Sequence, residues 1–342
     1  MPLAFQPPLP PMEARSVDAI PSGHEWQYEP KWDGFRCLAF RDGDHVYLQS
    51  KAGQPLARYF PDVVAALARL SAECFVLDGE LAIPIGNALS FDELQLRLHP
   101  AAGRVQKLAA AHPALLIVFD FLAGENGESL LALPLHERRN RLERFASKYL
   151  RAQSSIRLSP ATTDRAMATK WFEKVGGDLD GVIAKKIDAS YASGERTAMV
   201  KVKQIRTVDC VVGGFRYATG KPVLGSLLLG LYDGAGLLNH VGFTSAFKTP
   251  ERPALTKQFE ALKKAPGFTG DAPGGPSRWS TERSAEWEPV DPTAVVEVTY
   301  DHFTGGRFRH GTKIVRWRPD KAPRQCTLEQ VEGREGKSLA LL

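Results

Sequence analysis

Apolar runs of strand length alternate with segments of helical period over the first 205 residues. Alternating or continuous apolar positions predict strands, whereas apolar residues at every third or fourth position predict an amphipathic helix. On this basis we expect an α+β first domain. Its expected elements are a hairpin in FRCLAFRDG and HVYLQS, a helix at 61–70, strands in CFVLDGELAI, a central strand in ALLIVFDFL, a helix in HERRNRLERFASKYL and a buried strand in GVIAKK.

The pattern changes after Ile205. Short segments rich in valine, leucine and aromatic residues follow, separated by glycine-containing turns, and one helical stretch lies at 250–264. These segments are CVVGGFRYA, VLGSLLLGLY, GLLNHVGFTS and AVVEVTYDHF. Short strands joined by glycine turns are typical of a small β-barrel. We therefore predict two domains, at residues 1–205 and 206–342, the second of them a barrel.

Composition excludes several classes of protein. Of the 342 residues, 43% are hydrophobic and 24% are charged, which is ordinary for a globular chain and excludes a disordered or fibrous one. The longest apolar run, 114–119, is cut by Asp120 and is far shorter than the ~18 apolar residues of a membrane helix. The proline-rich N-terminus lacks the basic and apolar regions of a secretory signal, so we expect a cytoplasmic protein without membrane contact.

The cysteines and the charges give weaker signals. Cys37, Cys74, Cys210 and Cys326 form no CxxC pair, which favours ordinary buried thiols over a zinc site or a disulfide scaffold. The net charge of +5 is too small to prove a nucleic-acid partner. However, seven basic residues face one acid over 307–324, which predicts a surface that binds anions. A basic strand on a solvated barrel face is the alternative.

The segment Glu29–Arg36, EPKWDGFR, is the most informative one. It places the amine of Lys31 two residues before Asp33 and five before Arg36. A lysine amine can act as a nucleophile, a carboxylate can bind a metal, and an arginine can bind a phosphate. A solvated lysine–aspartate pair near a turn would give the same pattern, so the segment alone does not decide.

Further charges lie inside runs that should be buried, at Asp78–Glu80, at Asp180 and at Lys201 and Lys203. Buried charges are costly unless they are paired or bind a ligand. Lys201 and Lys203 alternate with valines, so a strand would place both on one face, where a phosphate between them would relieve their repulsion. An edge strand with a solvated lysine face is the alternative for these two residues.

Together these segments resemble the motifs of the covalent nucleotidyltransferase superfamily, and within it the short bacterial ATP-dependent DNA ligases of the C type. The resemblance covers nearly the whole chain and implies a nucleotidyltransferase (adenylation) domain followed by an OB-fold β-barrel domain. The motifs occur in order as KWDGFR from Lys31, SKAGQPLARYFPD from Ser50, LDGEL around Glu80, VFDFL at Phe119, DGVIAK from Asp180, VKVK ending at Lys203 and RWRPDK from Arg316.

The resemblance implies that Lys31 attacks the α-phosphate of ATP, releases pyrophosphate and carries AMP as a phosphoramidate. Lys201 and Lys203 would favour the neutral amine of Lys31 and stabilise charge on the α-phosphate. The other implied nucleotide contacts are the ribose hydroxyls with Glu80, the adenine with Phe119, the base edge with Glu29, the sugar or the nick phosphate with Arg36, and the β- and γ-phosphates with Arg318 and Lys321.

The resemblance also implies magnesium or manganese, with Asp33 and Asp180 as the ligands. Asp180 departs from the family, which more often has glutamate at this position. Lys51 departs as well, because many relatives have an arginine that grips the nick 5′-phosphate, and lysine keeps the charge without the bidentate fork. The residues expected at the DNA are Lys51, Arg58, Arg309 and Arg316.

The implied activity is that of an ATP-dependent DNA ligase, which seals 5′-phosphate/3′-hydroxyl nicks in duplex DNA through lysyl-AMP and DNA-adenylate intermediates, in DNA repair. We expect a near-minimal, monomeric enzyme of the bacterial cytoplasm and nucleoid, with repair proteins as candidate partners. An RNA ligase or a capping-type guanylyltransferase shares much of the pattern, and so does an inactive nucleic-acid-binding homologue. The nucleotide that becomes attached to Lys31 separates these alternatives.

Overall fold

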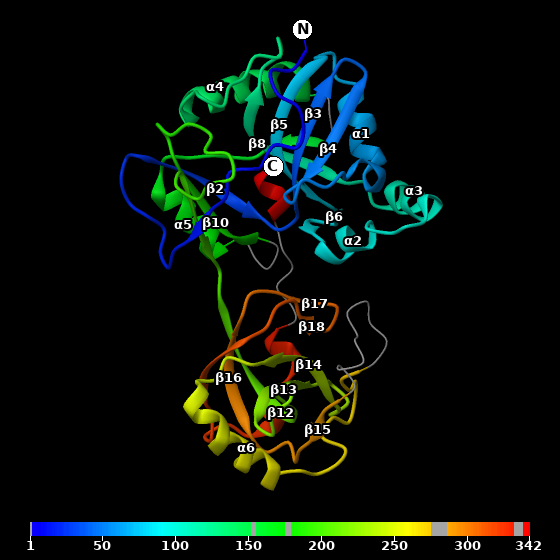
Figure 1. Ribbon diagram of the computed structural model, residues 1–342, viewed down its shortest axis with the longest axis vertical. Coiled ribbons are helices and arrows are strands. Elements are labelled where there is room, and N and C mark those ends of the chain that lie inside the picture. The colour runs from blue at the N-terminus through cyan, green and yellow to red at the C-terminus, as the bar shows by residue number, and fades with distance from the viewer. Residues whose placement is uncertain (1, 152–154, 175–178, 275–285, 332–337) are drawn as a thin grey trace. The chain divides into compact units, whose positions relative to one another are not determined.

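The computed structural model describes residues 2–151, 155–174, 179–274, 286–331 and 338–342. Its contacts divide the chain into two units, Met1–Gln204 with Arg334–Leu342, and Ile205–Gly333 (Figure 1). The division after Gln204 lies one residue from the predicted boundary. The last residues differ from the prediction, because they belong to the first unit: Leu339, Leu341 and Leu342 pack against an apolar cluster that contains Trp32 and Leu179.

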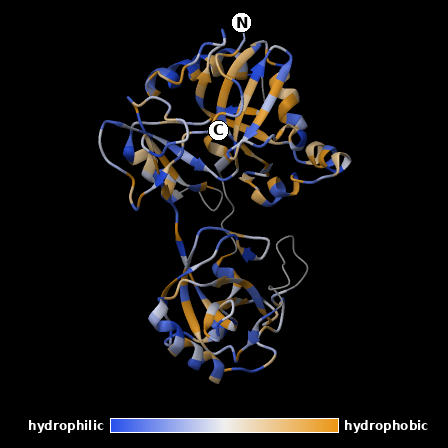
Figure 2. Cartoon of the chain, viewed as in Figure 1, coloured by the Kyte–Doolittle hydropathy of each residue, from blue (hydrophilic) through white to orange (hydrophobic). Residues whose placement is uncertain are grey.

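One sheet of the first unit has five strands in the order β4-β3-β5-β8-β9. All neighbours are antiparallel except β8 and β9, which are parallel. The strands are β3 (Phe35–Asp42), β4 (His45–Ser50), β5 (Cys74–Ala82), β8 (Leu115–Ala123) and β9 (Ile156–Leu158). Figure 2 shows how densely apolar residues follow these strands, as expected for a sheet that is buried on both faces.

The other sheet of this unit has four strands in the order β1-β11-β10-β2. They are β1 (Arg15–Ser16), β2 (Trp26–Trp32), β10 (Leu179–Lys186) and β11 (Met199–Lys203). A two-stranded ribbon of β6 (Pro84–Ile85) and β7 (Ala88–Leu89) lies apart from both sheets in the pairing. Because β2 contains Lys31 and β11 contains Lys201 and Lys203, this sheet carries the predicted nucleophile and the two lysines expected beside it.

Local sequence favours the start of two helices of the first unit. Pro61 occupies the first turn of α1, and the Ser90 hydroxyl caps α2 by accepting a hydrogen bond of 3.2 Å from the Glu93 amide. The helices are α1 (Pro61–Ala68), α2 (Phe91–Leu96), α3 (Ala102–Ala111), α4 (Leu135–Phe145), which continues as a π-helix (Ala146–Leu150), and α5 (Arg165–Lys174), with short 3-10 turns at Ala57–Tyr59 and Ser338–Leu341.

The second unit is built on a curled sheet in the order β14-β13-β12-β16-β19, with β15 paired to β12. A single bridge from Thr244 to Thr312 links its two edges, so the described strands form no continuously closed barrel. The predicted strands are present, but the prediction that they close into a barrel is wrong, because only this bridge joins the edge strands. The elements are β12 (Arg206–Tyr217), β13 (Leu224–Tyr232), β14 (Leu238–Thr244), α6 (Arg252–Ala261), β15 (Glu288–Pro289), β16 (Val295–Tyr300), β17 (Phe303–Thr304), β18 (Arg307–Phe308) and β19 (Lys313–Trp317), with 3-10 turns at Thr249–Glu251, Pro323–Gln325 and Leu328–Gln330.

The α+β class is confirmed, and so are the predicted hairpin of β3 and β4, the helices α1, α4 and α6, and the four strand segments after Ile205. The segment CFVLDGELAI forms a single strand, β5, which lies at the centre of its sheet. All four cysteines are buried and free, as predicted. Within the described ranges, no helix has the length and apolar character needed to cross a membrane.

Candidate active site

Strand register brings the predicted lysines together on one face of the four-stranded sheet. Gly181 of β10 lies opposite both Lys31 of β2 and Lys203 of β11, and Ile183 lies opposite Glu29 and Lys201. Gly181 has φ +137°, and a Cβ there would overlap the Val202 carbonyl oxygen. Only glycine suits this position, where the register of β10 against β2 shifts between Leu179 and Gly181. The intervening residue, Asp180, is thereby placed beside the lysines.

Asp180 is the carboxylate nearest to the candidate nucleophile. Its Oδ2 pairs with the Lys31 ammonium and lies 3.4 Å from Lys203 Nζ, and the aspartate side chain is only 5% exposed. The neighbouring Lys201 has a lowered pKa, first because it is partly buried and then because Lys31, Lys203 and Lys51 are all positive. The site therefore concentrates positive charge beside the buried carboxylate of Asp180.

The facing side of the site comes from the five-stranded sheet. Arg36 of β3, Glu80 of β5 and Phe119 of β8 line a pocket with Glu29 and Lys31. This pocket encloses about 400 Å³, counting space open to solvent. Five predicted residues from three β-strands of one sheet and one of another thus meet at one place.

Glu80 has a strongly perturbed acidity. Burial raises its pKa to about 7, and the negative charges of Asp33 and Asp78 act in the same direction. The positive charges of Lys31 and Arg36 oppose the rise. A carboxyl with a pKa near neutrality changes its charge within the physiological range, which is frequent at functional sites.

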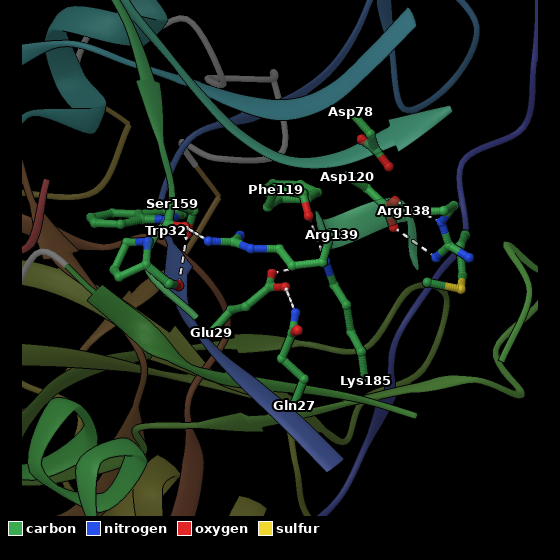
Figure 3. A network of polar contacts seen from close by, with 12 residues as sticks. Gln27, Glu29, Trp32, Asp78, Phe119, Asp120, Arg138, Arg139, Ser159 and Lys185 are labelled. Carbon is green, nitrogen blue, oxygen red and sulfur yellow. Dashed lines mark hydrogen bonds and ion pairs between the residues drawn. The ribbon is translucent and has the colours of Figure 1, made fainter. Parts of the chain in front are cut away.

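A buried ion pair lies at the inner end of the pocket (Figure 3). Lys185 Nζ is 2.8 Å from Glu29 Oε2, and the two side chains are 2% and 3% exposed. Gln27 Nε2 donates a hydrogen bond of 2.8 Å to the other oxygen of Glu29. Lys185 Nζ also lies 4.6 Å from the centroid of the Phe119 ring. Sequence reasoning missed Lys185, although strand period alone puts it on the face of Gly181 and Ile183.

Arg36 is fixed by a bidentate pair with a fully buried acid. Its Nε and Nη2 lie 2.5 and 2.6 Å from the two oxygens of Asp78, and Tyr191 donates a hydrogen bond of 2.7 Å to Asp78 Oδ2. The Asp78 charge raises the pKa of Arg36 despite burial, so the guanidinium stays charged. The guanidinium carbon of Arg36, Cζ, lies 4.6 Å from the centroid of the Phe119 ring. Phe119 is therefore in contact with two cations, Arg36 and Lys185.

A second layer of polar contacts holds the strands that carry these groups (Figure 3). Arg138 of α4 forms a bidentate pair with Asp120, at 2.8 and 3.0 Å, next to Phe119 on β8. Burial raises the pKa of Asp120, but the charge and hydrogen bonds of Arg138 outweigh this and lower it. Trp32 Nε1 donates a hydrogen bond of 2.9 Å to Ser159 Oγ beside Lys31 on β2. These contacts hold β8 and β2 in place, and the residues that make them, Asp120, Arg138 and Ser159, are not among those that line the pocket.

The cations predicted in the second unit converge on an acid that sequence reasoning missed. Arg318 Nη1 lies 3.0 Å from Asp209 Oδ1, and Lys321 Nζ lies 2.7 Å from Asp209 Oδ2. Arg318 also pairs with Asp320 at 2.9 Å. Asp209 is the single acid of β12, an otherwise largely apolar strand, which was an available signal. This cluster lies wholly within the second unit.

The residues predicted at DNA lie in different environments. Lys51 is 59% exposed and pairs with Glu13 at 3.1 Å, whereas Arg316 is 63% exposed and pairs with Glu297 at 2.6 Å. Arg58 donates a hydrogen bond of 2.8 Å to the Pro100 carbonyl. Arg309 is half-buried, with its Nε out of contact with solvent. None of these four roles is tested by the geometry, so all remain predictions.

Comparison with known proteins decides the family. A model described as "ATP dependent DNA ligase domain" matches residues 11–203, and one described as "ATP dependent DNA ligase C terminal region" matches residues 220–321. The chain is an ATP-dependent DNA ligase. It is 44% identical to DNA ligase C2 of Mycolicibacterium smegmatis over 97% of this chain and 96% of that protein. It is 42% identical to DNA ligase C of Mycobacterium tuberculosis over the same shares.

A solved structure supports the fold alone. A Lig E DNA ligase superposes with a TM-score of 0.54 at 16% identity, over 90% of this chain and 98% of that one. The predicted nucleotidyltransferase domain followed by an OB-fold domain, and the predicted ligase family, are confirmed. The two mycobacterial relatives are DNA ligases, which favours that prediction over a capping enzyme or an RNA ligase.

An ATP-dependent ligase uses a divalent metal ion, and the side chains around Lys31 fit one. Asp33, Glu80 and Asp180 supply carboxylate oxygens, the ligands that magnesium and manganese prefer. Over the described part of the chain, no three metal-binding side chains are already grouped as ligands. Magnesium is commonly held by one or two carboxylates together with substrate phosphates, so such a site would be completed by the nucleotide.

Proposed function

We propose that this ligase seals nicks through AMP carried on Lys31, and that the pocket between the two sheets binds the nucleotide. The observation that carries the proposal is the pairing of Lys31 with buried Asp180 at one end of a pocket whose other end holds Glu29 and Lys185. One end of this pocket has the Lys31 amine near other cations, and the other end has a hydrogen-bond donor, Lys185, fixed beside an acceptor, Glu29.

The inner end suits adenine. Lys185 can donate a hydrogen bond to N1 of adenine, and Glu29 can accept one from its 6-amino group. Guanine has a donor at N1 and an acceptor at position 6. The donor Lys185 would then face the N1–H donor, and the acceptor Glu29 would face the 6-oxo acceptor. A site built in this way discriminates strongly, because the wrong base leaves its polar groups unpaired. Phe119 would stack on the base, and Glu80 would accept hydrogen bonds from the ribose hydroxyls.

The outer end suits transfer of the α-phosphoryl group. Lys31 Nζ would form a bond to the α-phosphorus as the bond to pyrophosphate breaks, and Asp180 is placed to take the ammonium proton. The charges of Lys201 and Lys203 favour loss of that proton and stabilise the growing negative charge. A metal ion held by Asp33 and Asp180 would supply further charge neutralisation of the triphosphate.

In the later steps, the 5′-phosphate at the nick would attack the AMP phosphorus and release Lys31. The 3′-hydroxyl would then attack the activated 5′-phosphate, forming the phosphodiester and releasing AMP. We propose that Lys51, Arg58, Arg309 and Arg316 contact the DNA, and that Arg318 and Lys321 orient the β- and γ-phosphates of ATP. We further propose that the ligase acts as a monomer on nicked duplex DNA during repair, at the bacterial nucleoid.

The test is a labelling experiment with α-labelled ATP or GTP and magnesium or manganese, followed by a chase with nicked duplex DNA. We expect covalent label from ATP alone, its loss in Lys31→Ala, and its transfer to the nick. Lys186→Ala is the matched control, because Lys186 lies on the same sheet but is exposed. Label from GTP, or equal labelling of Lys31→Ala, would refute the proposal.

A further inference from the structure

Two cations of the first unit share one oxygen of a single acid. Glu13 Oε2 accepts hydrogen bonds from Lys51 Nζ at 3.1 Å and from Arg196 Nη2 and Nε at 2.8 and 3.1 Å. Lys51 and Arg196 are 59% and 66% exposed, whereas Glu13 is 25% exposed. The hydrogen bond from Lys51 is the main reason why the pKa of Glu13 is lowered. The acid is therefore charged and engaged at neutral pH.

The backbone fixes the position of this acid. The Glu13 amide donates a hydrogen bond of 2.8 Å to the Glu195 carbonyl, and the Met12 amide donates one of 3.0 Å to the Tyr191 hydroxyl. Tyr191 in turn holds Asp78, the partner of Arg36 in the nucleotide pocket. The segment that carries Glu13 is thus connected to the active site through two hydrogen bonds and one ion pair.

One of the two cations, Lys51, belongs to the electrostatic environment of the lysines around the candidate nucleophile. Lys51 lies close enough to Lys201 for its charge to lower the pKa of that lysine, together with Lys31 and Lys203. The pair formed by Lys51 and Arg196 is therefore an extension of the positive region around Lys31.

Lys51 and Arg196 are arranged like the cations of a phosphate-binding site, with the Glu13 carboxylate in the position of the phosphate. Lys51 offers a point charge, and Arg196 offers the planar fork that suits bidentate phosphate binding and that lysine at position 51 lacks. A carboxylate has one negative charge, whereas a phosphate monoester carries nearly two and has three acceptor oxygens. Exposed ion pairs are individually weak, at about 0–1 kcal/mol, so a dianion can displace Glu13.

We propose that Glu13 is an internal competitor for the 5′-phosphate of the nick, holding Lys51 and Arg196 together until DNA arrives. This inference rests on the proposed function, in which Lys51 contacts that phosphate. Before binding, Glu13 keeps the two cations in place and limits their affinity for other anions. After sealing, the phosphate has become a diester with a single charge, so Glu13 competes better and favours release of the product.

The experiment measures nick binding by adenylated enzyme in the presence of a metal chelator, which prevents AMP transfer. Fluorescent duplexes carry either a 5′-phosphate or a 5′-hydroxyl at the nick, and anisotropy gives the affinity of each. Glu13→Gln and Arg196→Ala are compared with Glu195→Gln, which removes one exposed charge from the same loop. Each variant is first adenylated with labelled ATP, so a failure of the proposed function appears there and not in the binding data.

For Glu13→Gln we expect affinity for the 5′-phosphate nick to rise by about three- to tenfold, with a much smaller change for the 5′-hydroxyl nick. For Arg196→Ala we expect the affinity for the 5′-phosphate nick to fall about tenfold or more, and for Arg196→Lys we expect a smaller fall. Equal changes for both nicks in Glu13→Gln would show general electrostatics instead and would overturn the proposal. So would an Arg196→Ala variant that still prefers the phosphorylated nick as strongly as the parent.

Discussion

Replacing Glu80 by glutamine should alter stability in a way that depends on pH. The folded protein holds the pKa of Glu80 at about 7, mainly through burial, against an ordinary value of 4.5. A raised acid pKa means that the folded state binds the proton more tightly than the unfolded state does. Stability from this group is therefore lost as the pH rises from about 4.5 to about 7, and then levels off. Glutamine has no such proton to lose.

The size of the effect follows from the shift. At 1.36 kcal/mol for each pKa unit, the folded state pays about 3 kcal/mol to ionise Glu80 above neutrality, and about 2 kcal/mol of this is added between pH 5.5 and pH 8. The free energy of unfolding of Glu80→Gln relative to the parent should therefore increase by about 2 kcal/mol over that interval.

Urea-induced unfolding at the two pH values measures this difference, after pyrophosphate has removed any AMP from Lys31. Glu137→Gln is a suitable control, because it removes an exposed carboxylate from the same unit. If the gap between Glu80→Gln and the parent were equal at both pH values, the argument that burial dominates the acidity of Glu80 would be refuted.

Three further predictions concern the ion pair of Glu29 and Lys185, the Asp209 carboxylate and the affinity for nicked DNA. Lys185→Met leaves the buried Glu29 without its cation and should cost about 3–5 kcal/mol of unfolding free energy, much of which Lys185→Met/Glu29→Gln should recover in a double-mutant cycle. Asp209→Asn should slow adenylation by ATP about tenfold, because Arg318 and Lys321 lose the carboxylate that both pair with, whereas sealing of a pre-adenylated nick should slow much less. Equal losses of rate in single-turnover assays of the two steps would contradict this. Nick affinity should fall steeply between low and physiological salt as phosphate contacts are screened, and a flat titration would argue against the predicted basic contacts.

Much of the site could be predicted because its residues lie in short motifs within strands. Strand period placed Lys201 and Lys203 on one face, and the register of β10 and β11 brought that face to Lys31. Family resemblance, rather than pattern, indicated which charges shared one pocket. Residue order does not show which strands of separate sheets will face each other, as Glu80 and Glu29 do here.

The missed residues are partners of predicted charges: Asp209 lies outside the motifs, and Lys185 ends the motif DGVIAK but was given no role. Lys185 and Asp209 each neutralise a predicted charge, yet their roles depend on contacts with residues about 110 or more positions away along the chain. The end of the first unit was missed for a similar reason, because the apolar residues of 338–342 are too few to indicate which core they join. Pairings of this kind are set by tertiary packing, which a local pattern does not encode.

The return of the C-terminal residues to the first unit has a topological consequence. The second unit is an insertion, since the chain leaves the first unit after Gln204 and rejoins it by Leu339. A module attached at both ends explores a smaller volume than one that hangs from a single linker, so its groups have a higher effective concentration at a target on the other module. If Arg318 and Lys321 act on the nucleotide as we propose, releasing Leu339, Leu341 and Leu342 from their apolar cluster would therefore lower the effective concentration of both cations there, without changing their contacts with Asp209.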